Sequence, residues 1–196
     1  MGASERNEPK RRIWHRIVTH LPADRFVFLD ESGANLTLAR RYGRAPKGER
    51  CPGHAPRNYP TNLTLIASCT TTGIGPSLLL DGPVDGAAFQ LYIERILVPT
   101  LQPGQIVVMD NLTVHKQEAV RVAIRQASCH PLYLPSYSPD FTPIELAFSK
   151  IKAYLRRVGV RTQDALEAAI AAAIDLVTPS DATGYFRHCG FTAPGL

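Results

Sequence analysis

Residues 105–152 read QIVVMDNLTVHKQEAVRVAIRQASCHPLYLPSYSPDFTPIELAFSKIK. The stretch begins with QIVVMD (105–110), a strand so apolar that both of its faces are expected to be buried. A polar helix at about 116–127 and a short strand at 131–135 follow, and the Pro-rich loop SYSPDFTP leads into a helix at about 143–158. This alternation of strands and helices predicts an α/β sheet with helices on its faces.

The sequence on either side of this stretch extends the same pattern. Residues 1–24 form a polar lead-in, with a short helix expected around 13–18. Strands are predicted at 25–30, 35–42, 63–70 and 76–80, helices at 85–97 and 163–177, and an irregular tail at 179–196. The folded core is therefore expected at 25–178, as a mixed central sheet flanked by helices. A ribonuclease H-like fold is one such architecture, but the order of elements alone does not select it.

Composition excludes several classes of protein. The 196 residues are enough for one domain with a sizeable core. No apolar run approaches the ~18 residues of a membrane span, and the N-terminus lacks the apolar run of a secretory signal. The four cysteines include no CxxC pair, so reduced cytoplasmic thiols are expected. A zinc site would need Cys51 and His54 to meet Cys129-His130 and His188-Cys189 from three distant segments, and is disfavoured.

Positive charge is concentrated in three segments. Residues 1–16, 40–57 and 150–161 hold 16 of the 22 Lys and Arg residues but only 3 of the 17 Asp and Glu residues. Such segregation suits a protein that binds a polyanion, because neutralising phosphates releases condensed counterions. Solvated surfaces that aid solubility are an equally good explanation for any single segment, so charge alone permits a nucleic-acid partner without proving one.

Three acidic residues stand where predicted elements end or begin. Asp30 ends the first strand, Asp110 ends the most apolar strand, and Glu145 opens the helix after the Pro-rich loop. Ligand sites of open α/β sheets form where strand ends converge. Carboxylates gathered there would repel one another unless a cation holds them, and hard oxygen ligands suit Mg²⁺ or Mn²⁺. Two such ions can assist a phosphodiester displacement.

Each acid also has a purely structural interpretation. Asp30 and Asp110 are of the type that caps turns or helices beyond a strand. Thr142-Pro143-Ile144-Glu145 fits a capping box, with Thr142 as N-cap and Pro143 at the first helical position. Taken singly, the acids favour these structural roles; the motifs around them favour a metal site.

Four ordered motifs resemble the DDE transposases of the mariner superfamily, most closely its bacterial insertion-sequence branch. They are FLDESG (28–33), RRYGRAPKGER (40–50), VVMDNLTVHK (107–116) and LPSYSPDFTPIELAFSKIK (134–152), and the resemblance runs from about residue 25 to 158. The interval of 34 residues between Asp110 and Glu145 is typical of that branch. The chain departs from the family pattern at Thr142, where Asn is usual.

The resemblance implies a ribonuclease H-like core in which Asp30, Asp110 and Glu145 bind two divalent ions, Mg²⁺ or Mn²⁺. It implies a DDE endonuclease that cuts a strand at the end of a mobile element, so that the exposed 3′-hydroxyl attacks target DNA, commonly at TA, and the strand is joined to it. The implied partners are transposon-end and target DNA and a second copy of the chain on that DNA. Residues 1–24 are too short for the helix-turn-helix domains of full-length relatives, so a separate chain carrying that reader is also expected. The implied location is the bacterial cytoplasm, with nucleoid association when DNA is bound.

Neighbouring residues carry further expectations. Asn111 and His115 belong to the DN…H motif, and His115 either positions a phosphate, orients Asp110 or is a structural histidine. Glu31 is expected on the face of the strand opposite Asp30, outside the metal site. The residues expected to contact DNA are Arg40, Arg41, Arg44, Lys47, Lys150, Lys152 and Arg156.

Two other functions remain open from the sequence. A catalytically idle transposase remnant would bind DNA through the basic segments without cutting it. A ribonuclease H-like nuclease would use the same fold on a different substrate. Magnesium-dependent cleavage of DNA, beside a test on an RNA–DNA hybrid, distinguishes the three functions.

Overall fold

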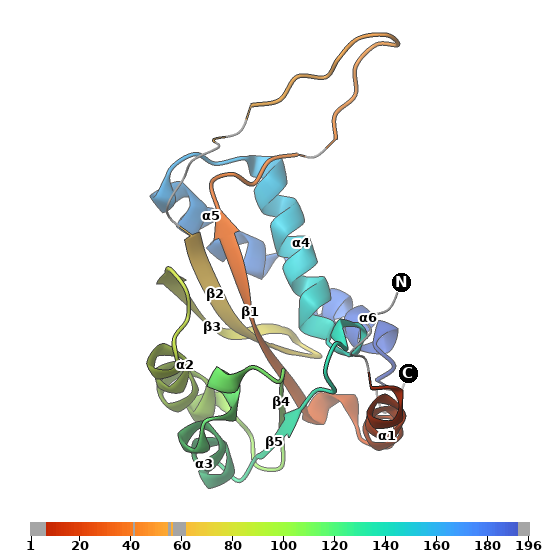
Figure 1. Ribbon diagram of the computed structural model, residues 1–196, viewed down its shortest axis with the longest axis vertical. Helices are drawn as coiled ribbons and strands as arrows, with labels where there is room; N and C mark the ends of the chain where they lie inside the picture. Colours follow the sequence, from red (N-terminus) through yellow and green to blue (C-terminus); the bar gives the residue numbers. More distant parts are fainter. Residues whose placement is uncertain (1–6, 41, 55, 57–61, 192–196) are drawn as a thin grey trace.

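A five-stranded mixed sheet organises the molecule (Figure 1). The computed structural model describes residues 7–40, 42–54, 56 and 62–191. The strand order is β3-β2-β1-β4-β5, in which β1 (Phe26–Asn35), β2 (Asn62–Thr70) and β3 (Gly73–Asp81) form an antiparallel meander. The strands β4 (Ile106–Met109) and β5 (His130–Tyr133) continue the sheet in parallel with β1. This arrangement confirms the predicted mixed sheet.

Helices cover both faces of the sheet. On one face lie α1 (Glu8–Val18), α4 (Pro143–Val158), α5 (Gln163–Asp175) and α6 (Pro179–His188); on the other lie α2 (Gly86–Tyr92), the π-helical turn η2 (Ile93–Leu97) and α3 (Glu118–Gln126) (Figure 1). Short 3₁₀ turns complete the chain: η1 (Ala23–Arg25), η3 (Val98–Thr100), η4 (Thr113–Lys116) and η5 (Pro139–Phe141).

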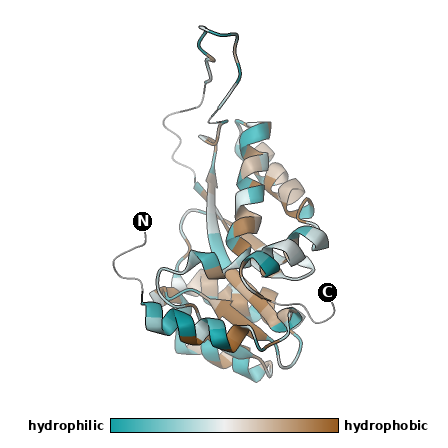
Figure 2. Ribbon diagram, turned by 90° about the vertical axis from the view of Figure 1, so that its right-hand side faces the viewer, coloured by the Kyte–Doolittle hydropathy of each residue, from teal (hydrophilic) through white to brown (hydrophobic). Residues whose placement is uncertain are grey.

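Alternation along β1 and β4 separates two hydrophobic cores. Phe26 and Phe28 belong to the core under α4, whereas Val27 and Leu29 belong to the core under α2 and α3, because successive side chains of a strand point to opposite faces. Figure 2 shows apolar residues gathered on the strands and on the helix surfaces that meet them, with hydrophilic residues outside. Both faces of the central strands are therefore buried, as the apolar run at 105–110 predicted.

The first strand is longer than the sequence suggested. It pairs with β2 as far as Asn35, so Asp30 lies within β1 and not at its end. The strand predicted at 35–42 is wrong, because the chain turns there: Oδ1 of Asn35 accepts hydrogen bonds from the N–H of Thr37 (3.1 Å) and from its hydroxyl (2.6 Å). An Asn side chain that bonds the backbone two residues ahead is a recurrent way to end a strand.

Both ends of the described chain pack on the core. The prediction of an irregular tail is wrong for Pro179–His188, which form α6. Phe186 of α6 and Phe191, which follows the helix, both lie edge-on to Phe28. Their ring centroids are 5.4 and 5.1 Å, respectively, from that of Phe28. The predicted short helix near the N-terminus begins earlier, at Glu8, and buries Trp14. Burying each large apolar side chain contributes about 1.5–3 kcal/mol, so these ends stabilise the sheet.

Residues 42–54 extend away from the body beyond the C-terminal end of α4 (Figure 1) and are mostly hydrophilic (Figure 2). Among the described residues, no helix has both the length and the apolar character needed to cross a bilayer.

Candidate active site

Strand register brings the three predicted acids to one cavity. Phe28 of β1 pairs with Val108 of β4, so two residues further on Asp30 is level with Asp110, just past the end of β4. Glu145 arrives in the first turn of α4, which packs against β1. Asp30, Asp110 and Glu145 all line a cavity of about 460 Å³, together with Asn111, Leu112, Thr142 and residues 134–139.

Asp30 is the acid whose charge is most strongly disfavoured. Burial, together with the negative charges of Glu145, Glu31 and Asp110, raises the pKa of Asp30 from 3.8 to about 7. Its Oδ1 accepts a 2.8 Å hydrogen bond from the N–H of Glu31, which opposes the rise only in part. Asp30 therefore sits in a negative environment that lacks a compensating charge.

Asp110 is held in the opposite state. Burial raises its pKa, but hydrogen bonds from His115 and from the N–H of Leu112 outweigh burial and lower the pKa overall. Both bonds end on Oδ1, at 2.6 and 2.9 Å. Asp110 is thus ionised and oriented before any ligand arrives.

His115 is a buried connector rather than a residue that lines the cavity. Its ring lies 4.3 Å from the ring of Phe89, centroid to centroid, and it is fully buried. Burial lowers its pKa, but the hydrogen bonds to Asp110 and Glu31 raise the pKa to about 9. At neutral pH the ring is therefore protonated and donates to both carboxylates.

The first turn of α4 leaves the Glu145 side chain outside a capping box. Thr142 occupies the N-cap position but makes no capping hydrogen bond, although the sequence fits the capping-box pattern. Pro143 supplies the helix start through its fixed φ, with no need for the side-chain cap. Glu145 is exposed and faces the cavity that Asp30 and Asp110 also line.

Asn111 has a structural partner. Its side-chain NH₂ group donates to the carbonyl of Leu134, which ties the end of β4 to the loop after β5. Asn111 also lines the acid cavity. Its contact with Leu134 shapes one wall of that cavity.

The donor chemistry of the cavity fits Mg²⁺ or Mn²⁺. Three carboxylates share it, and a divalent cation would relieve the burial and the mutual repulsion that together raise the pKa of Asp30. Within the described part of the chain, no three His, Cys, Asp or Glu side chains are already grouped closely enough to hold an ion. The acids therefore need side-chain adjustment to bind one together.

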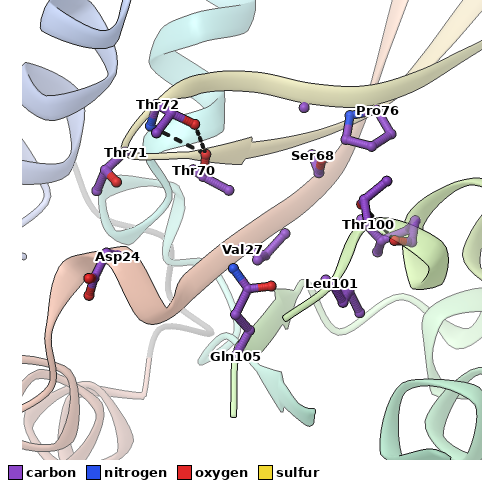
Figure 3. A pocket seen from close by; sticks show the side chains of 12 residues that line it. Asp24, Val27, Ser68, Thr70, Thr71, Thr72, Pro76, Thr100, Leu101 and Gln105 are labelled. Atoms are coloured by element: carbon purple, nitrogen blue, oxygen red, sulfur yellow. Dashed lines mark hydrogen bonds between the residues drawn. The ribbon is translucent and has the colours of Figure 1, made fainter. Parts of the chain in front are cut away.

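A second cavity, of about 310 Å³, lies between the β2–β3 turn and the segment before β4 (Figure 3). Five of its lining residues carry a hydroxyl group, among them Thr70 and Thr72, whose hydroxyls are hydrogen-bonded to each other at 2.8 Å. Among the described residues that line it, Asp24 is the one acid, so the carboxylate set of the first cavity is not repeated there.

Part of the predicted DNA-binding set converges at the far end of α4. Arg40, Arg44 and Arg156 line a cavity of about 810 Å³. His54, Arg157 and Arg161 line the same cavity, although they were not among the residues expected to contact DNA. Arg161 donates to the carbonyls of Leu36 (3.3 Å), Leu38 (3.4 Å) and His54 (3.3 Å), and so holds the basic segment against the helix. We refer to these six basic residues as the basic end of α4.

The remaining predicted DNA contacts lie elsewhere. Lys47 is exposed in the extended segment, and Lys152 is half-buried on α4. Lys150 forms a 2.6 Å ion pair with Asp181, so the positive charge of Lys150 is already paired within the protein. Arg41 lies outside the described residues.

Comparison with known proteins assigns the fold. The family model described as DDE superfamily endonuclease matches residues 25–167. No curated protein matches the sequence. The Mos1 strand transfer complex aligns with a TM-score of 0.78 and 18% identity, over 95% of this chain and 58% of that chain. The catalytic domain of Mos1 mariner transposase aligns with a TM-score of 0.66 and 16% identity, over 93% and 86% of the two chains.

This chain spans about three fifths of the Mos1 chain in that complex. At such low identity the structural similarity shows the fold, which is the ribonuclease H-like fold of the Mos1 catalytic domain. The order of elements did not select this fold, but the parallel addition of β4 and β5 to an antiparallel meander agrees with it. Because the family model covers most of its length, the chain belongs to the DDE superfamily endonuclease family.

Proposed function

We propose that this chain is the catalytic domain of a transposase that hydrolyses a phosphodiester bond at a transposon end. The freed 3′-hydroxyl would then attack a phosphodiester bond of target DNA, which joins the transposon 3′-oxygen to the target 5′-phosphate and releases the target 3′-hydroxyl. The observation that carries the proposal is the meeting of Asp30, Asp110 and Glu145 in one cavity of a DDE superfamily chain. The similar Mos1 structures include a pre-cleavage transpososome and a paired-end complex with the left transposon end, which supports DNA as the substrate here.

The three acids would hold two divalent ions, Mg²⁺ or Mn²⁺. Mos1 paired-end complexes with Mn and with Mg support this choice. When bound, the ions would supply activation of the attacking oxygen and stabilisation of the leaving one. Asp110 is already ionised and fixed by His115, whereas Asp30 and Glu145 would adjust around the ions and the scissile phosphate. The walls formed by Asn111 and residues 134–139 would orient the DNA strand.

The DNA is proposed to run along α4. Glu145 and Arg156 are eleven residues apart on one helix, which corresponds to about 16 Å, or about five nucleotide steps of a strand. A DNA strand about five nucleotides long would therefore reach from the acid cavity to the basic end of α4. Arg40, Arg44 and Arg156 would bind phosphates, with Lys47 and Lys152 beside the path and Arg41 in the same basic segment.

Further features of the proposal follow the family resemblance. They are target cutting at TA, a second copy of the chain on the same DNA, a separate chain that carries the helix-turn-helix reader, and membership of the bacterial insertion-sequence branch. The chain would then act in the cytoplasm, on the nucleoid.

Nicking of supercoiled plasmid DNA in Mg²⁺ or Mn²⁺ tests the proposal. Asp110→Asn keeps the size of the side chain but removes its charge, and we expect nicking to fall by at least about a hundredfold because several kcal/mol of transition-state stabilisation are lost. Glu167→Gln removes an exposed acid of α5 and is expected to nick as the wild type does.

Other results identify other functions. Equal nicking by the wild type and Asp110→Asn would contradict the proposed site. Binding of DNA without any metal-dependent cleavage would indicate an idle remnant. Cleavage of an RNA–DNA hybrid in preference to duplex DNA would indicate a ribonuclease H-like nuclease.

A further inference from the structure

Glu31 reaches the active site from the opposite face of the sheet. It follows Asp30 on β1, and its side chain lies on the α2–α3 side with Val27 and Leu29, as strand alternation requires. It does not line the acid cavity, and its side chain is only 14% exposed. A carboxylate with so little contact with water needs a polar partner.

That partner is His115. Its Nε2 lies 2.8 Å from Oε1 of Glu31, and its Nδ1 lies 2.6 Å from Oδ1 of Asp110. The ring stacks near Phe89, and the carbonyl of His115 accepts a 3.0 Å hydrogen bond from the hydroxyl of Tyr133. The imidazole is therefore fixed at its ring face and at its backbone, and it links the two carboxylates across the end of β4.

The link determines which oxygen of Asp110 is available to a ligand. His115 and the N–H of Leu112 both use Oδ1. No hydrogen bond engages Oδ2 within the described part of the chain, and Asp110 lines the acid cavity. Carboxylates that bind metals are commonly oriented by such outer partners, whose loss weakens metal affinity about 10–100-fold.

We propose that Glu31 is a positioning residue of the active site, which acts through His115 to hold Asp110 with Oδ2 presented to a divalent ion. The proposal rests on the proposed function, in which Asp110 binds the metal. Glu31 itself would touch neither metal nor DNA. It is the anchor of a Glu31–His115–Asp110 chain that crosses from one face of the sheet to the other.

Mn²⁺ binding to the full chain, followed by calorimetry and by the EPR signal of free Mn²⁺, tests the proposal without relying on activity. We expect Glu31→Gln to weaken Mn²⁺ binding about tenfold, because an amide keeps an acceptor but loses the charge, and Glu31→Leu to weaken it more. Glu94→Gln is the matched control: Glu94 is exposed, accepts a hydrogen bond from Gln90, and lies outside the acid cavity. The Mn²⁺ affinity of the Glu94→Gln variant should equal that of the wild type.

Two further measurements separate positioning from a structural role. Thermal unfolding in EDTA should show Glu31→Gln folded, so the Gln variant carries the test if the Leu variant does not fold. Raising the Mn²⁺ concentration should restore plasmid nicking to within a few-fold in Glu31→Gln, but not in Asp110→Asn. Such rescue distinguishes weakened metal binding from a lost ligand.

The outcomes are distinguishable. Wild-type Mn²⁺ affinity in Glu31→Gln, with weakened affinity in Asp110→Asn, would overturn the inference and leave the proposed function standing. Absence of Mn²⁺ binding by the wild type would overturn both. A loss of thermal stability in Glu31→Gln with unchanged Mn²⁺ affinity would assign Glu31 to the fold alone.

Discussion

At the scale of single residues, Asp30 combines a place in the acid cavity with a charge that its surroundings disfavour. Its carboxylate is largely buried beside three other acids, and its pKa is raised to about 7. We expect Asp30→Asn to stabilise the chain in EDTA at pH 8 by about 1–3 kcal/mol, because the amide removes a disfavoured charge and keeps an acceptor for the N–H of Glu31. The melting temperature of Asp30→Asn should then be roughly 2–8 °C above that of the wild type.

Asp81→Asn is the control for this comparison. Asp81 is an exposed acid at the end of β3, and its substitution should change stability by less than about 0.5 kcal/mol. A lower melting temperature in Asp30→Asn than in the wild type would mean that partners other than a metal stabilise the charge of Asp30.

The sequence predicted the residues of the cavity better than their connections. The predicted strand ends and the motifs around them indicated Asp30 and Asp110, and the helix start indicated Glu145; all three line one cavity, although Asp30 lies within β1. Alternation also placed Glu31 on the opposite face correctly. Orientation of Asp110 by His115 was one of three roles left open, but the bond from His115 to Glu31 was not predicted, because it depends on how the short turn Thr113–Lys116 packs against Phe89.

At the scale of elements, one local pattern has two outcomes. Thr-Pro-x-acid occurs at 142–145 and at 178–181, and a helix begins at both. At α6 the capping box forms: the hydroxyl of Thr178 accepts the N–H of Asp181 (3.2 Å), and Asp181 accepts the N–H of Thr178 (2.9 Å). At α4 Thr142 makes no such bond, and Glu145 faces the acid cavity. The pattern predicts a helix start but not the use of the acid.

The capping box of α6 predicts a pH-dependent stability. Lys150 and Thr178 lower the pKa of Asp181 from 3.8 to about 2. A lowered pKa stabilises the fold above about pH 4, and this stabilisation is lost as the pH falls toward 2. We expect Asp181→Asn to melt below the wild type at pH 7, and the difference to shrink between pH 4 and pH 3, as followed by circular dichroism.

Asp175→Asn, at the exposed end of α5, is the control for the loss of one acid and should change the melting temperature little. A difference between Asp181→Asn and the wild type that stayed constant from pH 7 to pH 3 would contradict an ionised cap.

Most elements were predictable because their signals are local. Helix α4 coincides with the predicted 143–158 because Pro143 starts it and Gly159, at φ 64°, ends it. The errors arise where tertiary contacts decide. Residues 31–35 remain in β1 because β2 pairs with them, which no local pattern shows. The capping-box pattern at 178–181 does signal the start of α6, whereas the contacts of Phe186 and the ion pair of Lys150 that stabilise this helix are tertiary.

At the scale of the whole molecule, a buried arginine of α1 binds the loop that precedes Glu145. Arg11 is 5% exposed and forms two hydrogen bonds with the Asp140 carboxylate, at 3.0 and 2.5 Å. Its guanidinium also lies 4.1 Å from the centroid of the Phe141 ring. The same loop contributes Ser138, Pro139 and Thr142 to the acid cavity. Residues of α1, far from the three acids in sequence, therefore fix one wall of the acid cavity.

Arg11→Lys tests this coupling, because a lysine cannot reproduce the two parallel hydrogen bonds or the stacked plane of a guanidinium. We expect the free energy of unfolding in urea to fall by about 1–3 kcal/mol and the amides of residues 136–142 to exchange with deuterium faster than in the wild type. Arg12→Lys makes the same exchange at the next residue, which is exposed, and should leave both measurements unchanged. If Arg11→Lys lowered stability while the exchange of 136–142 stayed as in the wild type, α1 would support the core without holding the wall of the cavity.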